Sequence, residues 1–117
     1  MTIRQGEIWT ANLNPTVANE QAGTRPCLVI SADRFNALPI RHCIVVPLTS
    51  RYRRLPHHVR ISDDGGLERP SWAMCEAVRA VSVSRLGDRI GSADEATVEV
   101  VRAQVTAWIE PNPALLR

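Results

Sequence analysis

The sequence predicts a mainly β fold, a small antiparallel barrel or curled sheet of five or six short strands followed by one C-terminal helix. Two apolar runs of similar character, 26–31 and 42–48, would form its centre. Turn residues separate these runs from further short strands, and a helical pattern begins only near residue 92. With 117 residues and 44% apolar content, the chain is expected to form one domain over residues 1–117.

The N-terminal part of the chain alternates strands with polar loops. Residues 6–13 (GEIWTANL) predict a first strand, ended by the turn signal Asn14-Pro15. The polar loop 14–24 has a length that is usual for functional or mobile loops. The consecutive apolar residues within 26–31 indicate a second strand that is buried on both faces.

The middle of the chain carries the third strand and several shorter ones. Residues 32–38 allow one helical turn, and 42–48 (HCIVVPL) predict the third strand. Pro47 cannot donate to a ladder, so we expect the end of this strand at an edge or a bulge. Further short strands are predicted, with a turn at 63–66, over 57–61, 71–78 and part of 81–90.

The last predicted element is a helix. The spacing Ser92-x-x-Glu95 matches a capping box, which predicts that the helix begins after Ser92, and Pro111 ends it. Four large apolar residues fall at helical spacing on one face, and we expect all of them to pack against the core: Val98, Val101, Val105 and Trp108.

The basic residues are distributed unevenly. All fourteen are arginines, and the net charge is only +2. The sequence has no acidic residue between Asp33 and Asp63, a window that holds six arginines and all three histidines. This distribution predicts a surface that faces a polyanion; a solvated loop with counter-ions is the alternative.

The cysteines lie far apart, each within an apolar run and without a CxxC pair: Cys27, Cys43 and Cys75. We therefore expect buried, reduced thiols. The sequence has no N-terminal apolar segment and no apolar run near the roughly 18 residues of a membrane span. The expected protein is cytoplasmic, with no membrane contact, no metal and no cofactor.

Two strand ends are predicted to meet. Pro26 biases Arg25 toward extended geometry, which places Arg25 at the first residue of the second strand with its guanidinium aimed off the sheet. Thr49 and Ser50 follow the third strand directly. If the two strands are antiparallel neighbours, the start of one lies beside the end of the other, and Arg25 lies beside Thr49. A planar cation next to a hydroxyl suits a phosphate group.

Plainer interpretations remain open at this stage. Arg25 could simply pair with Glu20 or Glu7, and the residues after the third strand could form an ordinary turn. His57 and His58 could bind a metal or shuttle protons. However, neighbouring residues in a strand point to opposite faces, so we expect solvent exposure of this pair and not joint chelation.

Several motifs run nearly end to end through the chain: Gly6-Glu7-Ile8-Trp9, Leu13-Asn14-Pro15, Glu20-Gln21-Ala22-Gly23-Thr24-Arg25-Pro26, Pro47-Leu48-Thr49-Ser50, Cys75-Glu76-Ala77-Val78-Arg79 and Arg85-Leu86. Together they resemble the MazF/PemK (Kid/MazF) toxin family of type II toxin–antitoxin systems. The resemblance implies an SH3-like barrel of five to seven short strands with a C-terminal helix. It also implies a C2 homodimer, a MazE-like antitoxin protein as partner, and metal-independent, sequence-specific endoribonuclease activity on single-stranded RNA such as mRNA.

The resemblance also implies roles for particular residues. The family's catalytic arginine and threonine map onto Arg25 and Thr49, and Glu20 is a weaker catalytic candidate. Ala77 departs from the family, which often has Gln there, so the cleavage sequence cannot be carried over. The candidate RNA contacts, two of which are alternatively structural charges (Glu76 and Arg79), are Gln21, Thr24, Ser50, Arg51, Arg53, Arg54, Glu76 and Arg79.

The chemistry follows from the residue types. RNA carries its own nucleophile, the 2′-OH, so an enzyme has to align it, accept its proton, stabilise the phosphorane and protonate the leaving 5′-oxygen. Arg25 can meet the developing charge without a metal, Thr49 or Ser50 can donate a hydroxyl, and Glu20 can accept the proton. The products would be a 2′,3′-cyclic phosphate and a 5′-OH.

Two other classes of function are consistent with the same sequence. One is a non-enzymatic, CcdB-like poison that binds DNA gyrase on a related barrel. The other is an RNA-binding barrel without catalysis. The Arg25/Thr49 pair and the acid-free arginine window favour the endoribonuclease.

Overall fold

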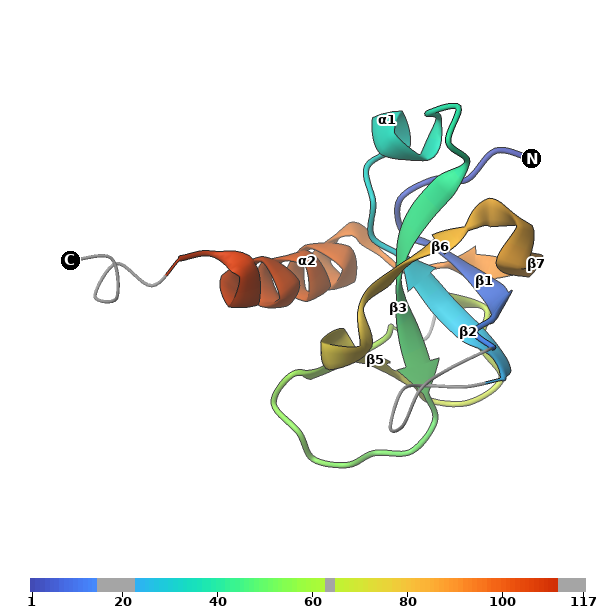
Figure 1. The fold of residues 1–117 in the computed structure, drawn as a ribbon. Helices are drawn as coiled ribbons and strands as arrows, with labels where there is room; N and C mark the ends of the chain where they lie inside the picture. The colour runs from blue at the N-terminus through green and yellow to red at the C-terminus, as the bar shows by residue number, and fades with distance from the viewer. Residues whose placement is uncertain (15–22, 63–64, 112–117) are drawn as a thin grey trace.

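The computed structural model describes residues 1–14, 23–62 and 65–111. Its main feature is a seven-stranded antiparallel sheet in the order β4-β5-β3-β2-β1-β7, with β6 also paired to β3 (Figure 1). The strands are β1 (Glu7–Asn12), β2 (Thr24–Val29), β3 (His42–Thr49), β4 (His58–Arg60), β5 (Trp72–Met74), β6 (Arg79–Ser82) and β7 (Leu86–Ser92). The helices are α1 (Asp33–Asn36) and α2 (Glu95–Ile109), with 3₁₀ turns η2 (Cys75–Ala77) and η3 (Val83–Arg85).

The predicted mainly β fold with a C-terminal helix is confirmed, but the sheet is not closed. Within the described residues, β4 and β7 are the two ends of the strand path and do not pair with each other. The sheet is therefore open, which agrees with the curled sheet that the sequence left as an alternative and not with the closed barrel that the family resemblance implied. No helix in the described part of the chain is long and apolar enough to cross a membrane.

Strand β3 is the centre of the sheet because it has neighbours along its whole length. On one side it pairs with β2, and on the other it pairs first with β6 up to Val45 and then with β5 from Leu48. Pro47 falls where the partner changes from β6 to β5. A residue that cannot donate to a ladder is tolerated at this switch, inside the sheet and not at its edge.

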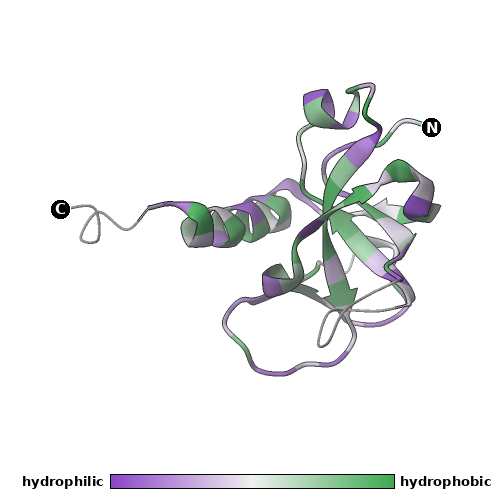
Figure 2. Ribbon diagram, viewed as in Figure 1, coloured by the Kyte–Doolittle hydropathy of each residue, from purple (hydrophilic) through white to green (hydrophobic). Residues whose placement is uncertain are grey.

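Alternate residues of the central strands bury themselves on opposite faces of the sheet. Trp9, Cys27 and Val45 belong to one apolar cluster, whereas Ile8 and Leu28 belong to the other. Helix α2 covers the second cluster with Val98, Val101 and Val105. Figure 2 shows the apolar residues gathered on the central strands, so the predicted burial on both faces is confirmed.

The three cysteines are free and buried, as expected. Burial raises the pKa of the Cys27 thiol to about 12, although the Arg25 and Arg79 guanidinium groups oppose this shift. Burial likewise raises the pKa of Cys43 and Cys75 to about 11. A thiolate is the reactive form of cysteine, so these side chains are packing residues at neutral pH.

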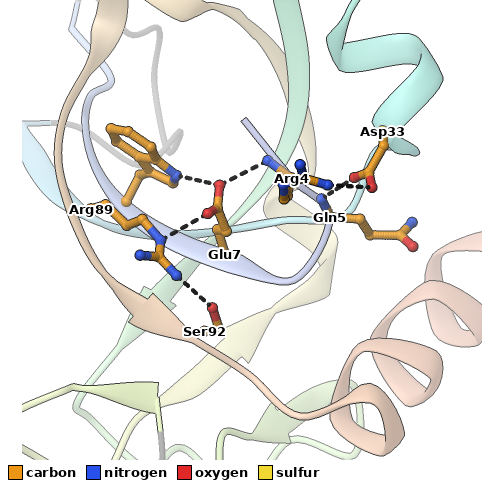
Figure 3. Close-up of polar contacts among 7 residues, drawn as sticks. Arg4, Gln5, Glu7, Asp33, Arg89 and Ser92 are labelled. Atoms are coloured by element: carbon orange, nitrogen blue, oxygen red, sulfur yellow. Dashed lines mark hydrogen bonds and ion pairs between the residues drawn. The ribbon is translucent and has the colours of Figure 1, made fainter. Parts of the chain in front are cut away.

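Glu7 is buried in a network that joins the N-terminal segment to β1 and β7 (Figure 3). Its carboxylate accepts hydrogen bonds from the Arg4 amide at 2.7 Å and from Trp9 Nε1 at 3.2 Å. Arg89 Nε lies 2.8 Å from Glu7 Oε2. Arg25 is not among the partners of this carboxylate, so the alternative in which Arg25 pairs with Glu7 is wrong.

One predicted strand differs from what is observed. Residues 71–78 do not form one strand, because the chain leaves the sheet at Met74 and makes the turn η2. This step moves the chain from one half of β3 to the other, where it pairs again as β6. The region 81–90 contains the end of β6, the turn η3 and most of β7, so the short strand predicted for part of it is confirmed as β7.

The C-terminal helix also begins and packs differently from the prediction. Ser92 is held in the β1–β7 ladder opposite Glu7, so the cap is Asp94, whose side chain accepts a hydrogen bond from the Thr97 amide at 2.8 Å. This bond lowers the pKa of Asp94. Trp108 is 50% exposed and not in the core. Figure 1 shows why: α2 projects away from the sheet, so its last turn has no strand beneath it.

Candidate functional site

The strand register brings Arg25 and Thr49 together. In the β2–β3 ladder, Cys27 is opposite Pro47 and Leu28 is opposite Val46. The paired residues end at Cys27 and Pro47, and the same register continued by two residues would set Arg25 opposite Thr49, at the strand ends that the sequence predicts to meet. Arg25 is the second residue of β2 and not the first, because the strand begins at Thr24.

Both side chains line one open pocket of about 510 Å³ at this end of the sheet. The walls come from the start of β2, the end of β3, the segment before β5 and strand β7. They are formed by Arg25, Pro26, Leu48, Thr49, Ser50, Gly66, Leu67, Glu68, Arg69, Ser71 and Ile90. A volume of this size accommodates a nucleotide-sized group.

Arg25 reaches the pocket from a half-buried position. Its Nε is buried and has no hydrogen-bond partner among the described residues. The guanidinium therefore has at least one donor that the fold leaves unused. An anion bound in the pocket would be the natural acceptor for the side chain.

The Thr49 hydroxyl has a defined orientation. Its Oγ1 accepts a hydrogen bond from the Arg51 amide at 3.1 Å. Because the oxygen serves as the acceptor in this bond, the hydroxyl proton remains available for donation to a ligand. Ser50 lines the same pocket and provides a second hydroxyl that can donate a hydrogen bond to a ligand.

One wall of the pocket is fixed by a close backbone contact. Gly66 has a φ of +78°, and a Cβ placed on it would lie 2.5 Å from the carbonyl oxygen of Ile90. A Cβ on Gly91 would lie 2.3 Å from the carbonyl oxygen of Gly65. Only glycine permits such a close contact between two backbone segments, and the segment before β5 therefore packs directly against β7.

The sequence analysis did not predict two pocket residues that follow this glycine contact, Glu68 and Arg69. Glu68 and Arg69 line the same pocket as Arg25 and Thr49, and both are exposed. The available signal was a charged pair separated from Gly65-Gly66 by Leu67 alone. Glu68 is the acidic residue that lines this pocket within the described part of the chain.

An arginine-rich loop lies beside the pocket, between β3 and β4 (Figure 1). Arg51, Arg53 and Arg54 are exposed and form no ion pair within the described residues. Tyr52 stacks on Trp72 with ring centroids 5.0 Å apart, and the Arg60 guanidinium lies 5.3 Å from the centroid of Trp72. The loop thus offers both cations and an exposed aromatic ring.

Other predicted site residues lie outside the pocket walls or outside the described residues. Thr24 is exposed at the start of β2 but does not line the pocket. Arg79 donates from Nη1 to the carbonyl oxygen of Leu13 at 3.3 Å, which is a structural contact between β6 and the end of β1. Glu20 and Gln21 lie outside the described residues.

Glu76 is likewise away from the pocket and contacts two histidines. His58 Nε2 lies 3.0 Å from both Glu76 carboxylate oxygens, and His57 Nε2 lies 3.6 Å from Glu76 Oε1. The expected exposure of the histidine pair is wrong for His58, which is buried. The alternation argument does not apply because β4 begins at His58, leaving His57 in the preceding turn.

The fold is the one found in solved MazF structures. The structure superposes on MazF from Deinococcus radiodurans with a TM-score of 0.83 at 23% identity, covering 93% of this chain and 97% of that one. A mycobacterial endoribonuclease in complex with its cognate antitoxin gives 0.76 at 21% identity, with coverage of 95% and 99%. At these identities the likeness establishes the fold.

The sequence establishes the family. Residues 4–109 match the PemK-like, MazF-like toxins of type II toxin–antitoxin systems, and the chain belongs to this family. It is 35% identical to Endoribonuclease EndoA of Bacillus subtilis over 86% of this chain and 89% of that protein. It is 32% identical to Endoribonuclease MazF9 of Mycobacterium tuberculosis over 91% of this chain and 98% of that protein.

Proposed function

We propose that this toxin is a metal-independent, sequence-specific endoribonuclease that cleaves single-stranded RNA, with mRNA as the physiological class, by attack of the 2′-OH. The observation that carries the proposal is the pocket that both Arg25 and Thr49 line, at the ends of two antiparallel neighbouring strands. The names of the relatives, EndoA and MazF9, which are endoribonucleases, support it. The same names disfavour a CcdB-like gyrase poison.

Each side chain has a defined task in this mechanism. The Arg25 guanidinium stabilises the charge that develops on the phosphorane oxygens, and the Thr49 hydroxyl donates to one of them. A carboxylate accepts the 2′-OH proton. Glu20 is the candidate from the family motif, and Glu68 is a second candidate because it lines the pocket.

The decisive experiment is cleavage of a single-stranded RNA by purified protein in excess EDTA. We expect cleavage to continue, with a 2′,3′-cyclic phosphate on one product and a 5′-OH on the other. A mixed-sequence DNA of the same length serves as the control, because it lacks the 2′-OH and should remain intact. A strict metal requirement or 5′-phosphate ends would contradict this mechanism, and intact RNA with tight binding would identify a non-catalytic RNA-binding protein.

We also propose that the toxin acts as a C2 homodimer in the cytoplasm and is neutralised by a MazE-like antitoxin. Solved relatives include MazE–MazF assemblies from Deinococcus radiodurans, one with a TM-score of 0.76 to this chain. An acidic, partly apolar antitoxin segment would be attracted to the exposed arginines as RNA is, so the two should compete for one surface. Three buried free thiols are consistent with a reducing compartment.

The exposed arginine loop should supply RNA affinity and little chemistry. Arg53 and Arg54 follow the pocket residue Ser50 closely, but they do not line the pocket. In the Arg53→Ala/Arg54→Ala variant we expect a higher KM with kcat nearly unchanged. If both contact phosphates, the slope of log K against log salt should flatten by about 1.4, at roughly 0.7 per single-strand contact.

A matched double variant tests whether this effect is local. Arg34→Ala/Arg102→Ala removes the same charge from α1 and α2, at two positions that belong neither to the loop nor to the pocket wall. Its salt slope should stay near that of the unmodified protein. Equal slopes for the two double variants would mean that the RNA follows another path across the molecule.

A further inference from the structure

Three potential metal ligands converge on one point outside the pocket. His57 Nε2, His58 Nε2 and a Glu76 carboxylate oxygen all lie within 4.8 Å of one another. They come from the turn before β4, from β4 itself and from η2. None of the three lines the pocket that holds Arg25 and Thr49.

The spacing of these atoms suits a small tetrahedral cation. Ligand atoms at zinc bond lengths of about 2.0–2.1 Å lie about 3.3 Å apart in a tetrahedron. The distances to Glu76 Oε1 are 3.0 Å from His58 and 3.6 Å from His57, one on each side of that value. The remaining separation, between the two histidine ring nitrogens, is within 4.8 Å, so the exposed part of the site must close by a movement of the His57 and Glu76 side chains to place all three atoms around one ion.

The surroundings hold two of the ligands in place and keep the third open to solvent. The His58 side chain is 1% exposed, so its ring has little freedom to turn away. Trp108 packs against the His57 ring, with centroids 5.5 Å apart at an angle of 66°. The Glu76 side chain is 45% exposed, which gives an ion an entry path and leaves room for water as a fourth ligand.

We propose that His57, His58 and Glu76 form a binding site for one divalent cation of the zinc type. Two imidazoles and one carboxylate favour such an ion over Mg²⁺, which prefers oxygen ligands in octahedral geometry. The ion would connect the end of the arginine loop to η2, the turn that joins β5 to β6. The site does not rest on the proposed RNA cleavage, which needs no metal at Arg25 and Thr49.

The test uses the full chain without a histidine tag, stripped with EDTA and desalted. Titration with Zn²⁺ should show one ion bound per chain and a higher unfolding temperature, and Mg²⁺ should produce neither effect. Co²⁺ should give the visible absorption of a tetrahedral site without the sulfur charge-transfer band that cysteine ligation would add. His57→Asn and Glu76→Gln should each weaken Zn²⁺ binding at least tenfold.

The third histidine provides the matched control. His42 is exposed, and its Nδ1 lies 2.8 Å from the carbonyl oxygen of Ile40 in another part of the fold. His42→Asn should bind Zn²⁺ as the unmodified protein does. The proposal is overturned if the chain binds no Zn²⁺, if the His57 and Glu76 variants bind it undiminished while remaining folded, or if Co²⁺ reports sulfur ligation. Activity in EDTA is measured separately and bears only on the proposed RNA cleavage.

Discussion

Replacing Arg25 with alanine is expected to lower kcat for RNA cleavage by about 10²–10³-fold, because one preorganised donor to a developing oxyanion is lost. The effect should fall on kcat more than on KM, since the guanidinium is proposed to act on charge that grows in the transition state. Single-turnover cleavage of a defined RNA by Arg25→Ala, with circular dichroism to verify folding, measures it.

Two companion variants make this result specific. Arg25→Lys keeps the positive charge but loses the planar fork, so we expect it to recover only part of the lost rate. Arg34→Ala removes an exposed arginine from α1 and should leave kcat unchanged. A folded Arg25→Ala protein with normal kcat would remove Arg25 from the mechanism.

The Thr49 hydroxyl should matter to a similar extent. Thr49→Val keeps the shape of the side chain but removes both the proposed donor to phosphate and the acceptor for the Arg51 amide. We expect kcat to fall by about 10²-fold or more. Thr49→Ser restores a hydroxyl at the same position, so it should recover most of the activity.

The hydroxyl of Ser50 tests whether the effect is specific to Thr49 or would follow from the loss of any hydroxyl in the pocket. Ser50 also lines the pocket, but no register position places it opposite Arg25. Ser50→Ala should therefore change kcat less than Thr49→Val does. Assays of both variants on the same RNA would contradict this assignment if Ser50→Ala were the more damaging change.

The centre of the fold and the core of the site could be predicted because they depend on local signals. Two consecutive apolar runs predict strands buried on both faces, and β2 and β3 are such strands. Antiparallel pairing then brings the start of one beside the end of the other. The proximity of Arg25 and Thr49 could therefore be predicted from the sequence, because each residue stands at the end of one of these two apolar strands.

The remaining features depend on long-range contacts that no local pattern records. Residues 71–78 look like one strand, but β3 needs two partners in succession, so the chain turns at η2. Glu68 and Arg69 reach the pocket only because Gly66 and Gly91 allow two backbones to touch. Trp108 has correct helical spacing, but the helix extends beyond the sheet.

The Nε of Arg25, which is buried without an acceptor among the described residues, has a consequence for thermal stability. A donor that has lost its water without gaining an acceptor destabilises the folded state by about 1–3 kcal/mol. Selection for thermal stability alone would therefore favour an apolar side chain here, such as methionine. In the proposed mechanism that change would also remove the group that stabilises the phosphorane, so stability and catalytic activity place opposite demands on this position.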